Sequence, residues 1–182
     1  MVTIAKDVKI QVEFNPARVQ AYRLIGYDNR RLVDRDFNDD TKDAGEIGAG
    51  HTVTALYEVV PVGVPFEHAL DAPAYRVPAE GPGGSSLMTV KLRYKQPSAS
   101  VSQLLTHPVA DVPVEVADAS TDMMHASSVA IFGSLLSKRP LGAAATAPLL
   151  RSLSGRGVGA DRFGHRAEFG SLIGEAQRLH CF

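Results

Sequence analysis

Apolar and polar residues alternate in several stretches of the first two-thirds of the chain. A period of two is typical of β-strands, because successive side chains point to opposite faces of a sheet. Long connections rich in acidic residues, glycine or proline separate these stretches. The pattern therefore predicts an antiparallel, β-sandwich-like part over residues 1–117. Its strands are expected at residues 8–14, 22–27, 52–60, 88–94 and 112–116.

The first stretch divides most clearly into two faces. Its apolar and polar sets are Val8, Ile10, Val12 and Phe14, and Lys9, Gln11 and Glu13. We expect the apolar set to be buried and the polar set to face solvent. Asn15-Pro16 ends the stretch, because proline cannot donate to a neighbouring strand. A chain that starts directly before this strand would leave an open sheet edge. We therefore expect the isolated chain to dimerise, or to be less stable than it is beside neighbouring domains.

The last third changes to a helical period. Apolar residues share one face of a helix that ends near Lys138. A second, short helix starts at Thr146 with Pro148 in its first turn, and a third covers about residues 166–179. Strands followed by helices predict an α+β fold, in which residues 118–182 form about three helices. These helices are expected to pack on the β part, giving one composite domain of a longer protein. The candidate caps of the first helix are Asp118, Ser120 and Asp122, and its apolar face holds Met124, Ile131, Phe132, Leu135 and Leu136.

Composition narrows the classes of function. The 182 residues are 45% hydrophobic and 21% charged, as in a soluble globular protein. No apolar run approaches the roughly 18 residues of a membrane-spanning helix, so no direct membrane insertion is predicted. The single cysteine, Cys181, excludes an internal disulfide framework and a cysteine-rich zinc site. Phe163 is the only aromatic residue among the arginines near the C-terminus, and a nucleic-acid site would be more basic, so no nucleic-acid binding is predicted.

Residues 34–46, the acidic segment, contain six acidic side chains and only two basic ones. Oxygen-bearing side chains occupy alternate positions, as they do in calcium loops. The helix–loop–helix calcium pattern is nevertheless broken, because its glycine and its final glutamate are missing. Pairing with Arg30, Arg31 and Arg35, solvation, and docking of a basic partner remain as alternatives. The calcium candidates are Asp34, Asp36, Asn38 and Asp40.

No catalytic motif is complete. Residues 45–52 approach a phosphate-binding loop, but His51 replaces the required lysine and a strand pattern follows instead of a helix. The sequence contains no G-x-S-x-G elbow and no H-E-x-x-H pair. We therefore predict no catalytic residue, no cofactor and no metal beyond the calcium candidates.

Three sequence blocks resemble a known family. Residues 4–16, 22–30 and 36–58 together look like the C-terminal region, catalogued as a domain of unknown function, of bacterial proteins that contain a von Willebrand factor type A domain. The blocks at residues 91–95, 132–136 and 161–169 are similar to later parts of that region. His165 stands where the family is expected to have an aromatic residue such as tyrosine.

The resemblance implies a neighbour that this chain does not contain. In such proteins an adhesion-type metal-binding domain lies upstream, and the parent protein is exported or tethered to a membrane. No catalytic residue of the family can be carried over to this chain. We therefore predict a non-enzymatic accessory domain that supports binding to an unidentified protein partner and holds the upstream domain. The alternative is a calcium-stabilised binding module that uses the acidic segment. A hydrolase comes third, for want of a nucleophile–base arrangement.

Overall fold

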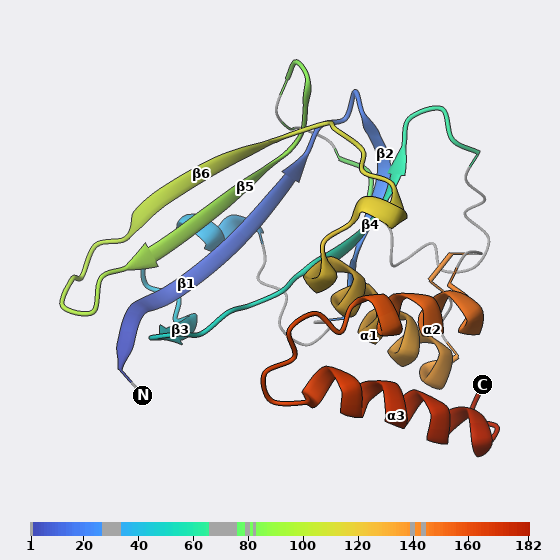
Figure 1. Ribbon diagram of the computed structural model, residues 1–182. Coiled ribbons are helices and arrows are strands. Elements are labelled where there is room, and N and C mark those ends of the chain that lie inside the picture. The colour runs from blue at the N-terminus through green and yellow to red at the C-terminus, as the bar shows by residue number, and fades with distance from the viewer. Residues whose placement is uncertain are drawn as a thin grey trace. The chain divides into compact units, whose positions relative to one another are not determined.

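The chain divides into two compact units, Met1–Val112 and Pro113–Phe182, which are described separately. The computed structural model describes residues 2–26, 34–65, 76–78, 81, 83–138, 141–142 and 145–182 (Figure 1). In this part of the chain, no helix is long and apolar enough to cross a membrane. The division falls slightly before the expected boundary at residue 117. The formation of one composite domain stays a prediction.

The first unit contains two antiparallel sheets. The four-stranded sheet has the order β3-β1-β5-β6, and the two-stranded sheet pairs β2 with β4 (Figure 1). A short 3-10 helix at Asp34–Asn38 precedes β3. These sheets, together with the C-terminal helices, confirm the α+β fold. The strands are β1 Thr3–Phe14, β2 Val19–Ile25, β3 Gly45–Gly48, β4 Leu56–Pro61, β5 Ser86–Lys95 and β6 Gln103–Ala110.

Four strand predictions are confirmed and one is wrong. The stretches at 8–14 and 88–94 lie within β1 and β5, whereas β4 begins later than expected and β2 ends before Tyr27, which lies outside the described residues. Residues 112–116 form no strand; the last strand is β6. In the described part of the chain, their alternating valines pair with no other strand. Pro108 is tolerated within β6 because β6 is an edge strand.

The open edge expected at the first strand is filled only over its first half, where the described pairs with β3 end at Val8. Dimerisation or lower stability of the isolated chain stays a prediction. β1 lies inside the sheet, since it pairs with β3 on one side and β5 on the other. β3 is the only described strand that pairs with the outer side of β1, and its residues show no alternation of apolar and polar side chains. The long exposed edge of this sheet is instead β6, which follows β5 in the chain.

An aromatic cluster lies where β1 ends. Phe14 is fully buried, and its ring centroid lies 4.4 Å from Tyr22 of β2 and 5.4 Å from Tyr57 of β4. Asn15 follows as a buried turn residue whose Nδ2 donates to the carbonyl oxygen of Ser86 at 2.8 Å. The Asn15-Pro16 stop predicted from the sequence is therefore confirmed. It places Phe14, one of the two buried aromatic residues described in this unit, at the end of β1.

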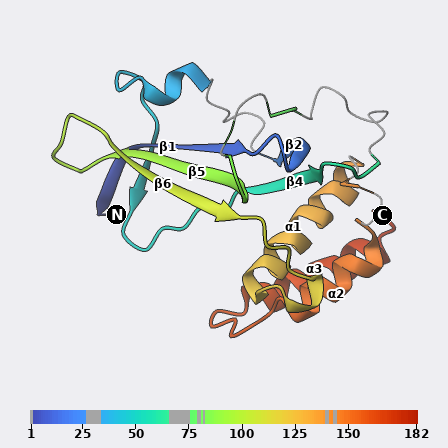
Figure 2. The same cartoon turned by 90° about the horizontal axis from the view of Figure 1, so that it is seen from above.

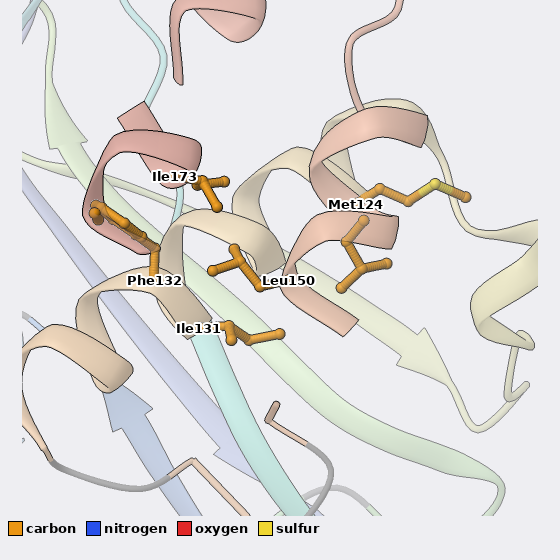
Figure 3. Packing of buried hydrophobic residues seen from close by; sticks show 7 residues of the cluster. Met124, Ile131, Phe132, Leu150 and Ile173 are labelled. Carbon is orange, nitrogen blue, oxygen red and sulfur yellow. The ribbon is translucent and has the colours of Figure 1, made fainter. Parts of the chain in front are cut away.

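The second unit contains the three predicted helices, α1 Thr121–Ser137, α2 Ala147–Arg156 and α3 His165–Arg178. The hydroxyl groups of Ser120 and Thr146 accept hydrogen bonds from first-turn amides, so both helices are capped as expected. Leu136 was expected on the apolar face of the first helix but is exposed. The core, shown in Figure 3, consists of Met124, Ile131, Phe132, Leu150, Leu153, Ile173 and Ala176.

The block at residues 161–169 has a structural role in this unit. The carboxylate of Asp161 accepts hydrogen bonds from the amides of Arg166 and Ala167 at 3.1 and 2.9 Å, which caps α3. These amide bonds hold the pKa of Asp161 below its ordinary value. The guanidinium of Arg166 donates to the carbonyl oxygen of Gly157 and to Asp122 of α1. These bonds connect the end of α2 and the start of α3 to the start of α1.

Candidate interaction surfaces

The register of the four-stranded sheet assigns its side chains to two faces. Residues directly opposite each other in an antiparallel pair share a face. Ile10 is opposite Leu92, and Leu92 is opposite Leu105, so these three lie on one face. Lys9, Arg93 and Leu104 are related in the same way and lie on the other. The two faces therefore differ sharply in chemistry.

The first of these we call the apolar face. It is incompletely covered, since Ile10 and Leu105 are 48% and 53% exposed. Ile10 was expected to be buried, and this expectation is wrong. The face is formed by Val8, Ile10, Val12, Phe14, Met88, Val90, Leu92, Leu105, His107 and Val109.

The other face, the polar face, is covered by the chain itself where Lys9 lies. Lys9 was expected in solvent but is only 4% exposed. Its ammonium group donates to the carbonyl oxygens of Asp36, at 3.1 Å, and Asp39. A buried charge is tolerated only when such acceptors compensate for lost water. The short helix at Asp34–Asn38 therefore lies beside β1 (Figure 2).

Arg93 and Lys95 of β5 extend this contact. Arg93 donates to the side-chain oxygens of Ser102 at 2.8 Å and Asn38 at 2.9 Å. Its guanidinium also lies 5.5 Å from the centre of the buried ring of Phe37. Lys95 donates to the carbonyl oxygen of Asp40 at 2.8 Å. Three cations of the sheet thus hold the acidic segment against the polar face.

A β-bulge in β1 brings a carboxylate into this network. The register shifts between Lys6 and Lys9, and Asp7 adopts a positive φ of 50°. Bulges of this kind redirect a side chain. The Asp7 carboxylate accepts a hydrogen bond from Lys95 at 2.8 Å. This bond lowers the pKa of Asp7 and raises that of Lys95.

In this arrangement, the side chains of two calcium candidates accept hydrogen bonds from the chain. Asn38 accepts from Arg93, and the Asp40 carboxylate accepts from the amide of Ser102 at 3.3 Å. The hydrogen bonding by Ser102 lowers the pKa of Asp40. Asp36 lies in the 3-10 helix, not in an extended loop, and the side chain of Asp34 lies outside the described residues.

Within the described residues, no group of three or more His, Cys, Asp or Glu side chains could hold a metal ion. Calcium binding by the acidic segment stays a prediction. The arginines proposed to compensate it, Arg30, Arg31 and Arg35, have side chains outside the described part. The compensating cations that are described were missed from the sequence. The pattern that could have predicted these cations is their place on the polar side of two predicted strands. Lys9 lies in the first strand, and Arg93 and Lys95 lie at alternate positions at the end of another.

These features define an α+β protein in which an antiparallel sheet unit is followed by a unit with three described helices. The chain belongs to the family described as "Uncharacterized protein YfbK, C-terminal", which matches residues 1–179.

One relative is the Uncharacterized protein YfbK of Escherichia coli (strain K12), 35% identical over 175 residues. The match covers 95% of this chain but only 30% of the relative, so the chain spans less than a third of the length of the curated relative it matches. No solved structure matches the chain.

Proposed function

We propose that this chain is a non-catalytic accessory domain that supports protein–protein binding beside a von Willebrand factor type A adhesion domain. The proposal rests on which face of the sheet is covered: part of the polar face is covered, and part of the apolar face is exposed. In a one-sided antiparallel sheet, the apolar face packs on the core and the polar face meets water. Here the acidic segment covers the polar face at Lys9, whereas the apolar face exposes Ile10 and Leu105. An apolar surface of this kind favours a further protein partner.

The family match supports the choice of partner. The matched region is the C-terminal part of a longer relative, so in that relative most of the sequence lies outside it. The resemblance of residues 4–16, 22–30 and 36–58 suggests that the neighbouring sequence includes a von Willebrand factor type A domain. We propose that this domain covers the apolar face, and that the whole protein works outside the cytoplasm.

Two neighbouring leucines of β6 provide a matched test. Leu105 lies on the apolar face and Leu104 on the polar face, and their exposures are similar, 53% and 46%. The chain and the von Willebrand factor type A domain are purified separately and mixed in a calorimeter. Leu105→Asp should weaken their binding by about tenfold or more, since a buried leucine contributes about 1.5–3 kcal/mol. Leu104→Asp should bind as the wild type does.

Two results would oppose the proposal. The first is an absence of binding between the wild-type chain and the separate domain. The second is an equal effect of Leu104→Asp and Leu105→Asp, which would mean that the face carries no specificity. Circular dichroism of both variants checks that the sheet is intact.

A further inference from the structure

A second apolar surface lies in the helical unit. A cavity of about 470 Å³ opens between residues 114–120, the first turns of α1, and Leu149 and Leu153 of α2. Its volume falls in the range of about 300–1,000 Å³ that is typical of ligand-binding pockets. All of its walls belong to Pro113–Phe182. We call it the helical groove.

The groove has a buried base and an exposed apolar rim. Met124 and Leu153 belong to the buried core of the unit. Val114, Val116 and Met123 line the same cavity but are exposed. Methionine side chains adapt to irregular partners, because they are unbranched and polarisable. The rim therefore offers apolar contacts that the core of this unit does not use.

The charge beside the groove is negative. Asp118 lines the cavity, and Glu115 lies three residues before it. Within the described part of the chain, neither carboxylate forms an ion pair. The guanidinium of Arg156 donates to the carbonyl oxygen of Ala117 at 2.6 Å and keeps its positive charge, so Glu115, Asp118 and Arg156 together leave one net negative charge beside the groove. After residue 118 the chain carries 7 basic and 4 acidic side chains, so this acidic rim is a local exception.

We propose that the helical groove binds an amphipathic helix of a protein partner. The helix would place its apolar stripe on Val116, Met123 and Leu149, with a lysine or arginine of its flank beside Asp118. An amphipathic helix in an apolar groove is a recurring mode of peptide recognition. Charge complementarity at Asp118 sets the sign of the flanking residues. The inference rests on the proposed function as a binding domain, and it adds a second surface and the chemistry of its partner.

The test uses two synthetic amphipathic helices with the same leucine stripe. One carries lysines beside the stripe and the other carries glutamates. Each is labelled and titrated into the full 182-residue chain, and binding is followed by fluorescence anisotropy. We expect the lysine helix to bind about two- to fivefold more tightly, as an exposed ion pair allows. Asp118→Lys should reverse this preference, and Val116→Asp should weaken the binding of both peptides.

Leu172→Asp is the matched control, because Leu172 is an exposed apolar residue of α3 outside the groove. It should leave both affinities unchanged. Amide chemical shifts should move at residues 114–124 when the lysine helix binds. Equal affinity for the two peptides, an unchanged preference in Asp118→Lys, or shifts centred elsewhere would overturn the proposal.

The proposal for the groove and the proposal for the sheet can be rejected independently. Loss of domain binding in Leu105→Asp, together with no peptide binding at the groove, would reject the groove and leave the proposed function standing. A small uncharged apolar dye that binds in the groove equally well in the wild type and Asp118→Lys, while neither peptide binds, would identify a small-molecule pocket and also reject the helix.

Discussion

The ammonium group of Lys9 lies beneath the acidic segment and bonds to two of its backbone carbonyls. A lysine is rarely buried without such acceptors, because removing its charge from water is costly. The same contact gives each of the two carbonyl oxygens a donor. Lys9 is therefore expected to order the segment as well as to be covered by it.

Replacing Lys9 with methionine tests this role. Lys9→Met keeps an unbranched side chain but leaves the carbonyl oxygens of Asp36 and Asp39 without this donor. We expect the free energy of unfolding to fall by about 1–3 kcal/mol, the cost of unsatisfied buried groups. Urea denaturation measures this loss, and amide exchange should accelerate in residues 36–43. Lys6→Met on the same strand is the control, and an equal loss there would contradict the assignment.

The bond between Asp7 and Lys95 predicts a dependence of stability on pH. The pKa of Asp7 is lowered on folding by its hydrogen bond from Lys95, so its ionised form stabilises the folded state. This contribution is complete above the ordinary pKa of 3.8 and is lost as the pH falls through the lower, folded value. At high pH, the group that matters is Lys95, whose pKa is raised on folding. Its contribution to stability is lost only as the pH rises past the ordinary pKa of 10.5 towards the folded pKa.

Asp7→Asn should therefore show a smaller loss of melting temperature than the wild type when the pH is lowered from 7 to 3. Differential scanning calorimetry at several pH values measures this difference. Glu115→Gln, at a carboxylate outside the network, should follow the wild-type curve. An Asp7→Asn curve parallel to that of the wild type would show that the bond does not contribute.

At the scale of elements, the acidic segment consists of a 3-10 helix, a turn and the first residues of β3, and its helix and turn contact the polar face. Asn38 and Asp40 already accept hydrogen bonds from Arg93 and Ser102. We therefore expect millimolar calcium to leave the melting temperature unchanged and to release no heat in calorimetry. A calcium-dependent increase that is lost in Asp36→Ala and Asp40→Ala would favour the calcium-stabilised module instead.

β6 is an exposed edge strand that contains a proline. An edge strand presents unpaired backbone groups to other chains, and proline removes one amide donor and hinders added pairing. Pro108→Val should therefore increase self-association at high concentration, which sedimentation velocity measures. His107→Val, at the neighbouring position, controls for the added hydrophobicity. Equal behaviour of the two variants would contradict a protective role for Pro108.

The elements differ in how well the sequence predicts them. The helices were predictable because caps at Ser120 and Thr146 coincide with a helical apolar period. β6 was missed because its residues are nearly all exposed, so no face imposes an alternation. The burial of Lys9 was missed for another reason: it depends on a contact with residues far along the chain. Periodicity predicts which side chains share a face, and tertiary contacts decide which face is covered.

At the scale of the whole molecule, the sheet unit buries Lys9 of its polar face and exposes part of its apolar face. The candidate site could be predicted only in part. The alternation at residues 8–14 and 88–94 identified the apolar face, but not that Ile10 remains half exposed. The partner that would cover this face is not encoded in the strand pattern. The proposed function therefore requires that a neighbouring domain covers this face.

Leucine methyl NMR with a soluble paramagnetic agent measures that covering directly. The agent broadens the signals of solvent-exposed methyl groups, and Leu104 and Leu105 report on opposite faces of one strand. In the isolated chain, both leucines should be broadened. When the proposed neighbouring domain is joined to the chain, we predict that Leu105 becomes protected whereas Leu104 remains broadened. Equal broadening of Leu105 in both forms would contradict the central claim that this face binds a neighbouring domain.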